Sequence, residues 1–304
     1  MKKREVNHDD KIFGDQPASL WNKIYDELVK QAIRFLSYEA SIGILGKTGS
    51  GKSTLVNALF GSNVRETSTY KGCSRDVGTV TLEIDGKKLH LYDLPGAGES
   101  IERDREYSQL YKEILPKLDV VLWVIKADDR ALTSDEVFYK EIILPYINES
   151  KTPILFVISN ADKMEPSWQS KWDTSHNPPT LISIGDKQKE ELANKINEVS
   201  EIFHVSEEIV IPVSSTGNFN LKNLLLKIVQ SVPPEKKAAI YDRTEKSVRS
   251  EEAAKDASDG VISVLVGTII SILPVIAPNF TDDLKEAIEK AARLVWNKVS
   301  GWFD

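Results

Sequence analysis

Cysteine and histidine are scarce in this sequence. Its 304 residues include one cysteine, Cys73, and four histidines. A single cysteine excludes an internal disulfide, and no Cys/His cluster has the spacing of zinc ligands. A signal peptide is also missing, because the charged N-terminus has no apolar core. We therefore expect a protein of a reducing compartment, the cytoplasm.

An excess of basic residues is absent as well. The 39 lysines and arginines are outnumbered by 46 aspartates and glutamates, which gives a net charge of -7. Nucleic-acid-binding proteins usually carry a basic footprint, so a nucleic-acid partner is not expected unless a local patch supplies it. Hydrophobic residues make up 41% and charged residues 28% of the chain, as in ordinary folded proteins. The length fits about two domains, or one large domain with an appendage.

From residue 40 to 231 the sequence contains an alternation of strand and helix patterns. This alternation predicts an α/β fold with a doubly wound, mostly parallel sheet. Asp85-Gly86 is a two-residue hairpin signal, so one antiparallel edge strand is expected. Residues 163–184 hold three prolines and two tryptophans and predict an insertion or long loop. The expected strands are 40–46, 79–84, 88–94, 118–125, 152–159 and 209–214, and the expected helices are 51–60, 133–146, 186–203 and 220–231.

Helical patterns also flank this α/β domain, which we place at residues 40–232. Residues 1–39 comprise a polar tail and a helix that we expect to pack on the domain that follows. Residues 233–259 are highly charged and predict a linker or an exposed helix. The rest of the chain, to residue 304, ends in an expected amphipathic helix over 281–303. One face of that helix holds Leu284, Ile288, Ala291, Val295, Val299 and Trp302.

Residues 260–278 form an uncharged apolar segment. As a helix the segment would be about 28 Å long, close to the roughly 30 Å hydrocarbon core of a bilayer. Three interpretations stay open: a buried helix in a C-terminal helical region, a membrane-inserted segment at the inner face of the cell membrane, and a homodimer interface. The flanking residues are acidic, so no basic cluster favours anionic lipid.

A phosphate-binding motif, G-x-x-x-x-G-K-[ST], spans residues 46–53. Its glycines allow backbone N–H groups to curl around a phosphate, and the helix that follows adds the positive end of its dipole. Lys52 supplies a charge for the β- and γ-phosphates, and the Ser53 hydroxyl is a ligand for Mg²⁺. The expected phosphate-binding residues are Lys47, Thr48, Gly49, Ser50, Gly51, Lys52, Ser53 and Thr54.

A second motif, Asp93-Leu94-Pro95-Gly96, stands at the end of an expected strand. Asp93 can hold Mg²⁺, directly or through water. The N–H of Gly96 can bond a γ-phosphate, and loss of that bond after hydrolysis would release the following loop. DxxG alone is a weak signal, but about 40 residues after a phosphate loop it is strong.

A base-reading motif follows the strand expected at 152–159. Ser159-Asn160-Ala161-Asp162 stands where GTPases have N-K-x-D, with Asn160 in place of the lysine. Asp162 can accept two hydrogen bonds from guanine, which adenine cannot supply, so the motif favours GTP and GDP. A frame one residue later would put Lys163 at the aspartate position, which is chemically wrong. Ser214 and Ser215 follow the last strand and fit a second base loop that acts through a backbone N–H.

Together these residues resemble the Era/TrmE-type GTPases, and in particular the bacterial Era-like GTPases of the YfjP/YkfA type. The stretches GKTGSGKSTLVNALFG, DLPGAGES, LDVVLWVIKADDRAL and NADK-EP carry the likeness, over about residues 40–231. The resemblance implies a Ras-like G domain and says little about the cellular role. It also suggests Ser74 as the first-switch residue that covers Mg²⁺ and the γ-phosphate, with Thr67, Thr69 and Thr79 as alternatives.

One departure concerns catalysis. Ala97 stands where Ras-type enzymes carry the water-orienting Gln, so slow hydrolysis is expected. Help could come from a cation, a partner or a dimer, and Arg130 is preferred over Arg75 and Arg103 as an arginine finger. The expected catalytic residues are Lys52, Ser74, Gly96 and Arg130, and the expected Mg²⁺ ligands are Ser53, Ser74 and Asp93. We thus expect a GTP-binding switch that slowly hydrolyses GTP; the alternative is a GTP-dependent assembly or membrane-remodelling protein.

Overall fold

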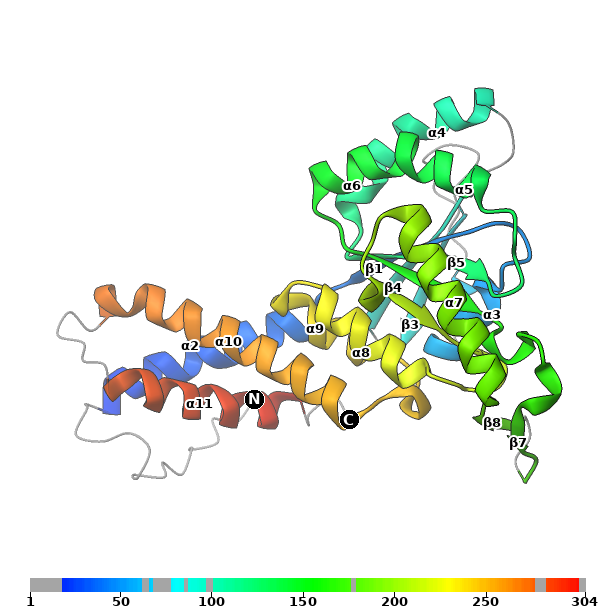
Figure 1. Cartoon of the computed structure of the whole chain (residues 1–304). Helices are drawn as coiled ribbons and strands as arrows, with labels where there is room; N and C mark the ends of the chain where they lie inside the picture. Colours follow the sequence, from blue (N-terminus) through cyan, green and yellow to red (C-terminus); the bar gives the residue numbers. More distant parts are fainter. Residues whose placement is uncertain are drawn as a thin grey trace.

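A computed structural model describes residues 18–61, 66–67, 78–84, 87–96, 101–175, 179–276 and 283–300. Within these residues, seven strands form one sheet in the order β2-β3-β4-β1-β5-β6-β9. Figure 1 shows this sheet beside a group of long helices that project away from it. The strands are β1 (Ala40–Leu45), β2 (Glu66–Thr67), β3 (Gly78–Ile84), β4 (Lys87–Leu94), β5 (Val120–Lys126), β6 (Ile154–Ser159) and β9 (Val210–Pro212).

The expected sheet topology is confirmed. Strands β4, β1, β5, β6 and β9 run parallel, whereas β3 pairs antiparallel with β4 and forms the expected hairpin. The turn at Asp85-Gly86 lies outside the described residues. β2, a short strand that was not expected, extends the antiparallel edge. Residues 120–125 of β5 are all buried, as their continuous apolar run predicts.

Helices cover both faces of the sheet, which makes the fold doubly wound. On one face, α4 (Ile101–Ile114), α5 (Thr133–Phe138), α6 (Leu144–Ser150) and α7 (Asp186–Phe203) share a core with strand residues such as Trp123 and Phe156. On the other face lie α3 (Lys52–Phe60) and α8 (Leu221–Ser231). The helix expected at 133–146 is longer than predicted, since a π-helical turn at Tyr139–Ile143 joins α5 to α6. Short 3-10 turns stand at Leu115–Lys117 and Glu207–Ile209.

The segment 163–184 is more ordered than a long loop. It holds a 3-10 turn at Ser167–Gln169 and two short strands, β7 (Lys171–Asp173) and β8 (Thr180–Ser183), that pair antiparallel in a small second sheet. The prediction of a loop is therefore wrong, while that of an insertion fits. Strands of three and four residues are too short to show a clear alternation of apolar and polar residues in a sequence.

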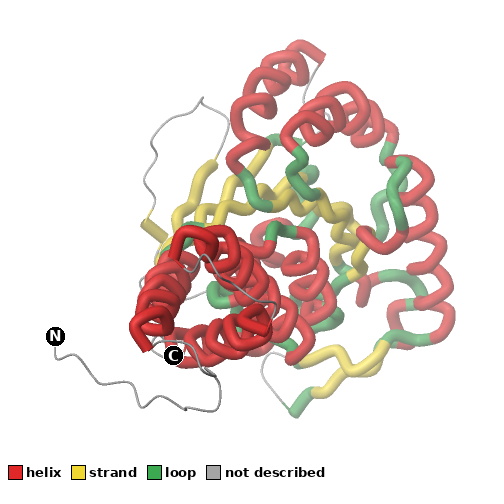
Figure 2. Tube along the Cα trace, turned by 90° about the vertical axis from the view of Figure 1, so that its left-hand side faces the viewer, coloured by secondary structure: helices red, strands yellow, loops and turns green. Residues whose placement is uncertain are grey.

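Three helices form a bundle beside the sheet: α2 (Ala18–Leu36), α10 (Glu251–Ile276) and α11 (Asp283–Ser300). Figure 2 faces the side on which this bundle projects in Figure 1, and the three helices there surround a common core. The apolar face expected on the last helix is confirmed for its members up to Val299; Trp302 lies outside the described residues. The expected packing of the first helix is wrong, because the buried residues of α2 contact α10 and α11.

The segment 233–259 is neither a linker nor an exposed helix. It forms α9 (Pro234–Tyr241), a 3-10 turn at Lys246–Val248 and the first turns of α10. Ile240, Val248 and Ala257 from these elements are buried in the core that lies under α3 and α8. The frequent charges of this segment conceal a sparse apolar face that packs on the α/β domain.

The apolar segment 260–278 lies largely within α10. Val261, Leu265, Ile269 and Leu273 are buried against the other two helices of the bundle. By length and composition, α10 alone among the described helices could also cross a membrane. The structure thus favours the buried-helix interpretation for one face of α10 and leaves the membrane and homodimer interpretations as predictions.

Candidate nucleotide-binding site

The phosphate loop connects β1 to α3. Its backbone is left-handed at three glycines: φ is 146° at Gly46, 80° at Gly49 and 94° at Gly51. A Cβ atom at Gly46 would overlap the carbonyl oxygen of Val124 on β5. Only glycine suits such a backbone and such close packing. The loop thereby curls in front of the N-terminus of α3, whose free N–H groups and helix dipole favour an anion.

Lys52 opens α3 and folds back over this loop. Its Nζ donates to the carbonyl oxygen of Gly46 at 2.7 Å and to that of Lys47 at 3.2 Å. The same nitrogen lies 4.0 Å from a carboxylate oxygen of Asp93. Ser53 and Thr54 follow on the first turn of α3 and are exposed. A cation, exposed hydroxyls and a carboxylate thus meet above the loop, as the motifs predict.

Lys47 belongs to the same loop, but its side chain turns away to the segment after β5. Its Nζ lies 2.5 Å from Asp135 and 3.1 Å from Asp129, and it donates to the carbonyl oxygen of Ala131 at 2.6 Å. Burial raises the pKa of Asp135 in spite of the nearby lysine charge. Any part that Lys47 has in binding phosphate must therefore come from its backbone.

The DxxG segment lies against the phosphate loop. Asp93, the penultimate residue of β4, has an exposed carboxylate. A Cβ atom at Gly96 would lie 2.9 Å from both the carbonyl carbon and the oxygen of Gly46, so no larger residue fits there without a shift. The hydroxyl of Tyr111 on α4 donates to the carbonyl oxygen of Pro95 and holds the segment from behind.

The base motif begins directly beside the phosphate loop. The Ser159 hydroxyl, at the end of β6, donates to the carbonyl oxygen of Ser50 at 2.6 Å. Asn160 adopts a left-handed φ of 55°, which Asn tolerates better than most residues. Asp162 follows in the 3-10 turn Ala161–Lys163 and is 8% exposed. Its Oδ1 is buried and accepts no hydrogen bond from any residue that the structure describes. A buried carboxylate oxygen without a donor costs free energy until a ligand supplies one.

The second base loop lies next to the first. The N–H of Ala161 donates to the carbonyl oxygen of Val213 at 3.0 Å, which joins the two loops. Ser214 is fully buried, and its hydroxyl oxygen accepts from the N–H of Gly217 at 3.1 Å. Ser214 thus shapes the turn through its side chain, while the half-buried Ser215 stands at the turn itself.

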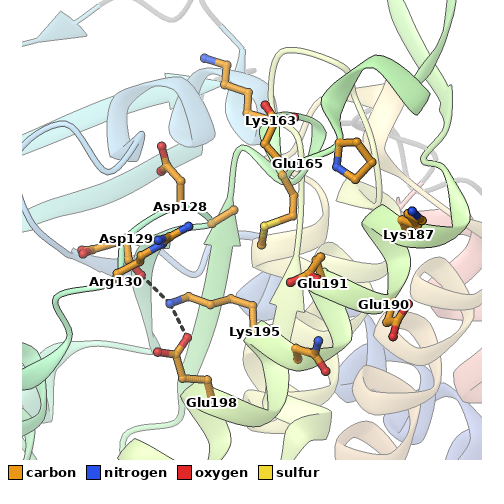
Figure 3. Close-up of a pocket in the computed structure, with 14 residues that line it drawn as sticks. Asp128, Asp129, Arg130, Lys163, Glu165, Lys187, Glu190, Glu191, Lys195 and Glu198 are labelled. Atoms are coloured by element: carbon orange, nitrogen blue, oxygen red, sulfur yellow. Dashed lines mark hydrogen bonds and ion pairs between the residues drawn. The ribbon is translucent and has the colours of Figure 1, made fainter.

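Arg130 lies between Asp129 and Ala131, both of which Lys47 of the phosphate loop contacts. Its exposed side chain lines a groove of about 1000 Å³ between residues 127–130, residues 163–166 and α7. Figure 3 shows these side chains, with Lys195 bridging Glu198 and the backbone of Asp129. No residue of the phosphate loop lines the groove in the described part of the chain. The finger role of Arg130 therefore stays a prediction.

Several predicted residues cannot be placed. Thr69, Cys73, Ser74, Arg75 and Ala97 lie outside the described residues, and nothing is described of the side chains of Thr67, Thr79 and Arg103. The described residues hold no group of three or more His, Cys, Asp or Glu side chains that could hold a metal ion.

Two contributors to the site were not found from the sequence. Asp135 anchors Lys47, and the fully buried Gln188 on α7 bonds the loop that carries Asp162. A glutamine in an amphipathic helix gives no signal of its own, because only the fold brings it against the loop.

Comparisons with known proteins agree with this geometry. A family model described as "50S ribosome-binding GTPase" matches residues 41–160. YkfA of Escherichia coli K12 is 34% identical over 292 residues, which cover 94% of this chain and 96% of that protein. YfjP of the same strain is 32% identical over 283 residues, which cover 91% of this chain and 93% of that protein. The GTPase Era of Aquifex aeolicus is 28% identical over 197 residues, covering 63% of this chain and 56% of that protein.

Both E. coli relatives match almost end to end, and both are named as uncharacterized proteins. With a phosphate loop, a DxxG segment and a base loop at one edge of a doubly wound sheet, the chain contains a P-loop GTPase domain. The chain belongs to the YfjP/YkfA family of Era-like P-loop GTPases.

Proposed function

We propose that this protein binds GTP and GDP at the carboxyl edge of its sheet, hydrolyses GTP slowly and acts as a nucleotide switch. The buried, unsatisfied Oδ1 of Asp162 carries the proposal. It belongs to a loop that Ser159 ties to the phosphate loop, so one ligand can reach both. Guanine offers two adjacent donors to such a carboxylate, and adenine does not.

The phosphates would lie over the N-terminus of α3, where Lys52 meets the free N–H groups. The hydroxyl of Ser53 and the carboxylate of Asp93 are hard oxygen donors at the same place and would hold Mg²⁺, together with Ser74. When bound, Mg²⁺ would neutralise charge on the β- and γ-phosphates. The Gly96 N–H would then report the presence of the γ-phosphate.

Slow hydrolysis follows from Ala97, which has no amide to orient water. Since Arg130 lines a groove outside the phosphate loop, we propose that it acts as a finger only across an interface with another molecule. The single substitution Arg130→Ala tests this point, because it should leave unstimulated hydrolysis unchanged.

The helices outside residues 40–232 would transmit the nucleotide state. α9 and α10 share the core under α3 and α8. A shift of α3 could therefore be transmitted to the bundle through packed side chains. A second candidate function, GTP-dependent assembly or action on a membrane, is favoured by the uncovered face of α10. Only 28% of its most apolar stretch is buried, and Val275 is 84% exposed.

Phosphate release and nucleotide binding test the proposal. The purified full-length chain should bind GDP at least about 100-fold more tightly than ADP, and it should release phosphate from GTP at a low rate. Lys52→Ala should abolish both, while Lys290→Ala, at an exposed lysine of α11, should change neither. Equal affinity for GDP and ADP, or full activity of Lys52→Ala, would overturn the proposal.

A further inference from the structure

Gln188 is a fully buried amide on the first turn of α7. Its Oε1 accepts from the N–H of Gly185 at 2.9 Å. Its Nε2 donates to the carbonyl oxygen of Met164 at 2.9 Å and approaches that of Asp162 at 3.4 Å. A primary amide that is buried with these partners is costly to replace, because its loss removes the acceptor of the Gly185 N–H and the donor to the Met164 carbonyl oxygen.

These bonds hold the turn that carries Asp162. The two carbonyl oxygens belong to the residues on either side of Lys163, so Gln188 fastens the turn directly behind the base-reading carboxylate. Ser170, from the insertion, adds to the same cluster: its hydroxyl lies 3.1 Å from Oε1 of Gln188 and 3.4 Å from the carbonyl oxygen of Asp162. The turn is thus tied to two elements, α7 and the insertion.

The insertion also contacts the second base loop. The N–H of Leu181 on β8 donates to the carbonyl oxygen of Gly217 at 2.8 Å. A Cβ atom at Gly217 would lie 2.7 Å from the side chain of Leu181 and 3.0 Å from that of Trp172, so the loop packs closely on both strands of the small sheet. The insertion and Gln188 together brace both base loops.

We propose that Gln188 is a positioning residue for guanine recognition, fixing the Asp162 carboxylate where it accepts from the ring N–H and the exocyclic amine. The inference rests on the proposed function, since it assumes that Asp162 reads guanine. Charge-assisted hydrogen bonds depend steeply on geometry, so a turn released by a fraction of an ångström loses much of this contact. The phosphate contacts, held by a different loop, keep their strength.

The ratio of the dissociation constants of IDP and GDP isolates this contact. Inosine lacks the exocyclic amine of guanine and is otherwise the same ligand, so the ratio is insensitive to phosphate binding and to partial loss of folded protein. We expect GDP to bind the wild-type protein about 10-fold or more tightly than IDP. In Gln188→Met, which keeps the length but makes no such bonds, the ratio should fall to about 3 or less. In Gln188→Glu, which keeps only the acceptor for Gly185, it should fall as well.

Lys189→Met is the matched control, because Lys189 is the next residue of α7 and is exposed. Its ratio should equal that of the wild-type protein. Equal losses of GDP and IDP affinity in both Gln188 variants, with an unchanged ratio, would overturn the positioning role. If neither variant folds, Ser170→Ala is measured in their place, and an unchanged ratio there overturns the proposal equally.

Asp162→Ala separates this inference from the function on which it rests. A wild-type ratio near 1, or an Asp162→Ala ratio equal to that of the wild type, would mean that Asp162 does not read guanine, and both proposals would fail. A ratio that collapses in Asp162→Ala but stays high in Gln188→Met would reject the positioning role alone.

Discussion

Lys47 and Lys52 stand in one phosphate loop and direct their charges to opposite sides. Lys52 lies over the loop, whereas Lys47 pairs with Asp135, whose side chain is 4% exposed. Removing one partner of a buried ion pair leaves the other charge unpaired, which costs more than the pair itself contributes. The Lys47–Asp135 pair therefore fixes the phosphate loop to the segment after β5.

We expect Lys47→Met to lose about 2–4 kcal/mol of stability at neutral pH. Asp135 already has a raised pKa, and the substitution should raise it further. A carboxyl group with a raised folded-state pKa loses stability as the pH rises from the unfolded value of about 3.9 through the folded value. In urea denaturation, the stability that Lys47→Met loses relative to the wild-type protein should therefore be small near pH 4 and reach its full size at pH 7.5. Lys47→Met with Asp135→Asn should recover most of it; an equal deficit at both pH values would contradict the account.

Two glycines of the loop should respond differently to alanine. Gly46→Ala places a Cβ against the carbonyl oxygen of Val124, whereas Gly49→Ala meets no atom within 4 Å. We expect a loss of at least about 3 kcal/mol for the first and about 1–2 kcal/mol for the second, from backbone strain alone. Chemical denaturation measures both, and similar losses would show that the close approach to β5 is not limiting.

At this scale, local spacing made much of the site predictable. The residues from Gly46 to Ser53, Asp93 with Gly96, and Asp162 each belong to a short motif, so the sequence alone indicates them. Asp135 and Gln188 belong to no motif, and each meets its partner only in the folded chain. The side-chain direction of Lys47 was likewise not predictable.

Among the elements, a buried polar cluster joins the helices to the sheet. Asp119, just before β5, is 2% exposed and accepts from the Tyr38 hydroxyl at 3.0 Å and from Lys236 Nζ of α9 at 2.6 Å. Its other oxygen accepts from the N–H of Ser41 at 2.9 Å. Nearby, Arg243 donates to the carbonyl oxygen of Tyr38, and burial lowers its pKa to about 10. This cluster ties the end of α2, α9 and the sheet together.

Tyr38 and Lys236 of this cluster predict a loss of stability in alkali. Burial raises the pKa of Tyr38, and the negative charge of Asp119 raises it further. Burial alone would lower the pKa of Lys236, but its bonds to Asp119 and Tyr38 leave it raised. Both groups then hold their protons longer when folded, so their contribution to stability should fall as the pH rises above about 10, whereas Arg243, whose pKa is lowered, contributes in the opposite sense. Asp119→Asn should cost about 1–3 kcal/mol at pH 8 and flatten the fall; parallel profiles from pH 8 to 11 would contradict this.

The sequence predicted the elements that have a strong period and missed those that lack one. The continuous apolar runs of β5 and β6 predict buried strands, and the periodic pattern of α7 predicts a helix. β7 and β8 are too short for a pattern, and α9 shows only three buried residues among many charges. The elements that were missed are those whose burial depends on distant parts of the chain.

For the whole molecule, α2 and the two last helices make one bundle although the α/β domain separates them in the sequence. Its core takes up one face of α10 and leaves the other uncovered (Figure 1). The amphipathic patterns predict that each helix buries a face, but they do not say against which partner. That pairing is a property of the complete fold.

One apolar face of α10 is already buried within the bundle. We therefore expect the full-length protein to stay unbound in a liposome flotation experiment. The assay uses GDP and a non-hydrolysable GTP analogue, with vesicles of neutral and of anionic lipid. Leu273→Asp, which opens the bundle at a fully buried position, serves as a variant that exposes the apolar core. Flotation of the wild-type protein with either nucleotide would instead support the membrane function.

The central claim is that Asp162 reads guanine beside the phosphate loop, and titration with GDP and XDP tests it most directly. Xanthine has an oxygen where guanine has its amine, and an amide can donate to that oxygen where a carboxylate cannot. We predict that the wild-type protein prefers GDP by about 100-fold or more and that Asp162→Asn reverses the preference. An Asp162→Asn protein that binds GDP as tightly as the wild type and still rejects XDP would contradict the account.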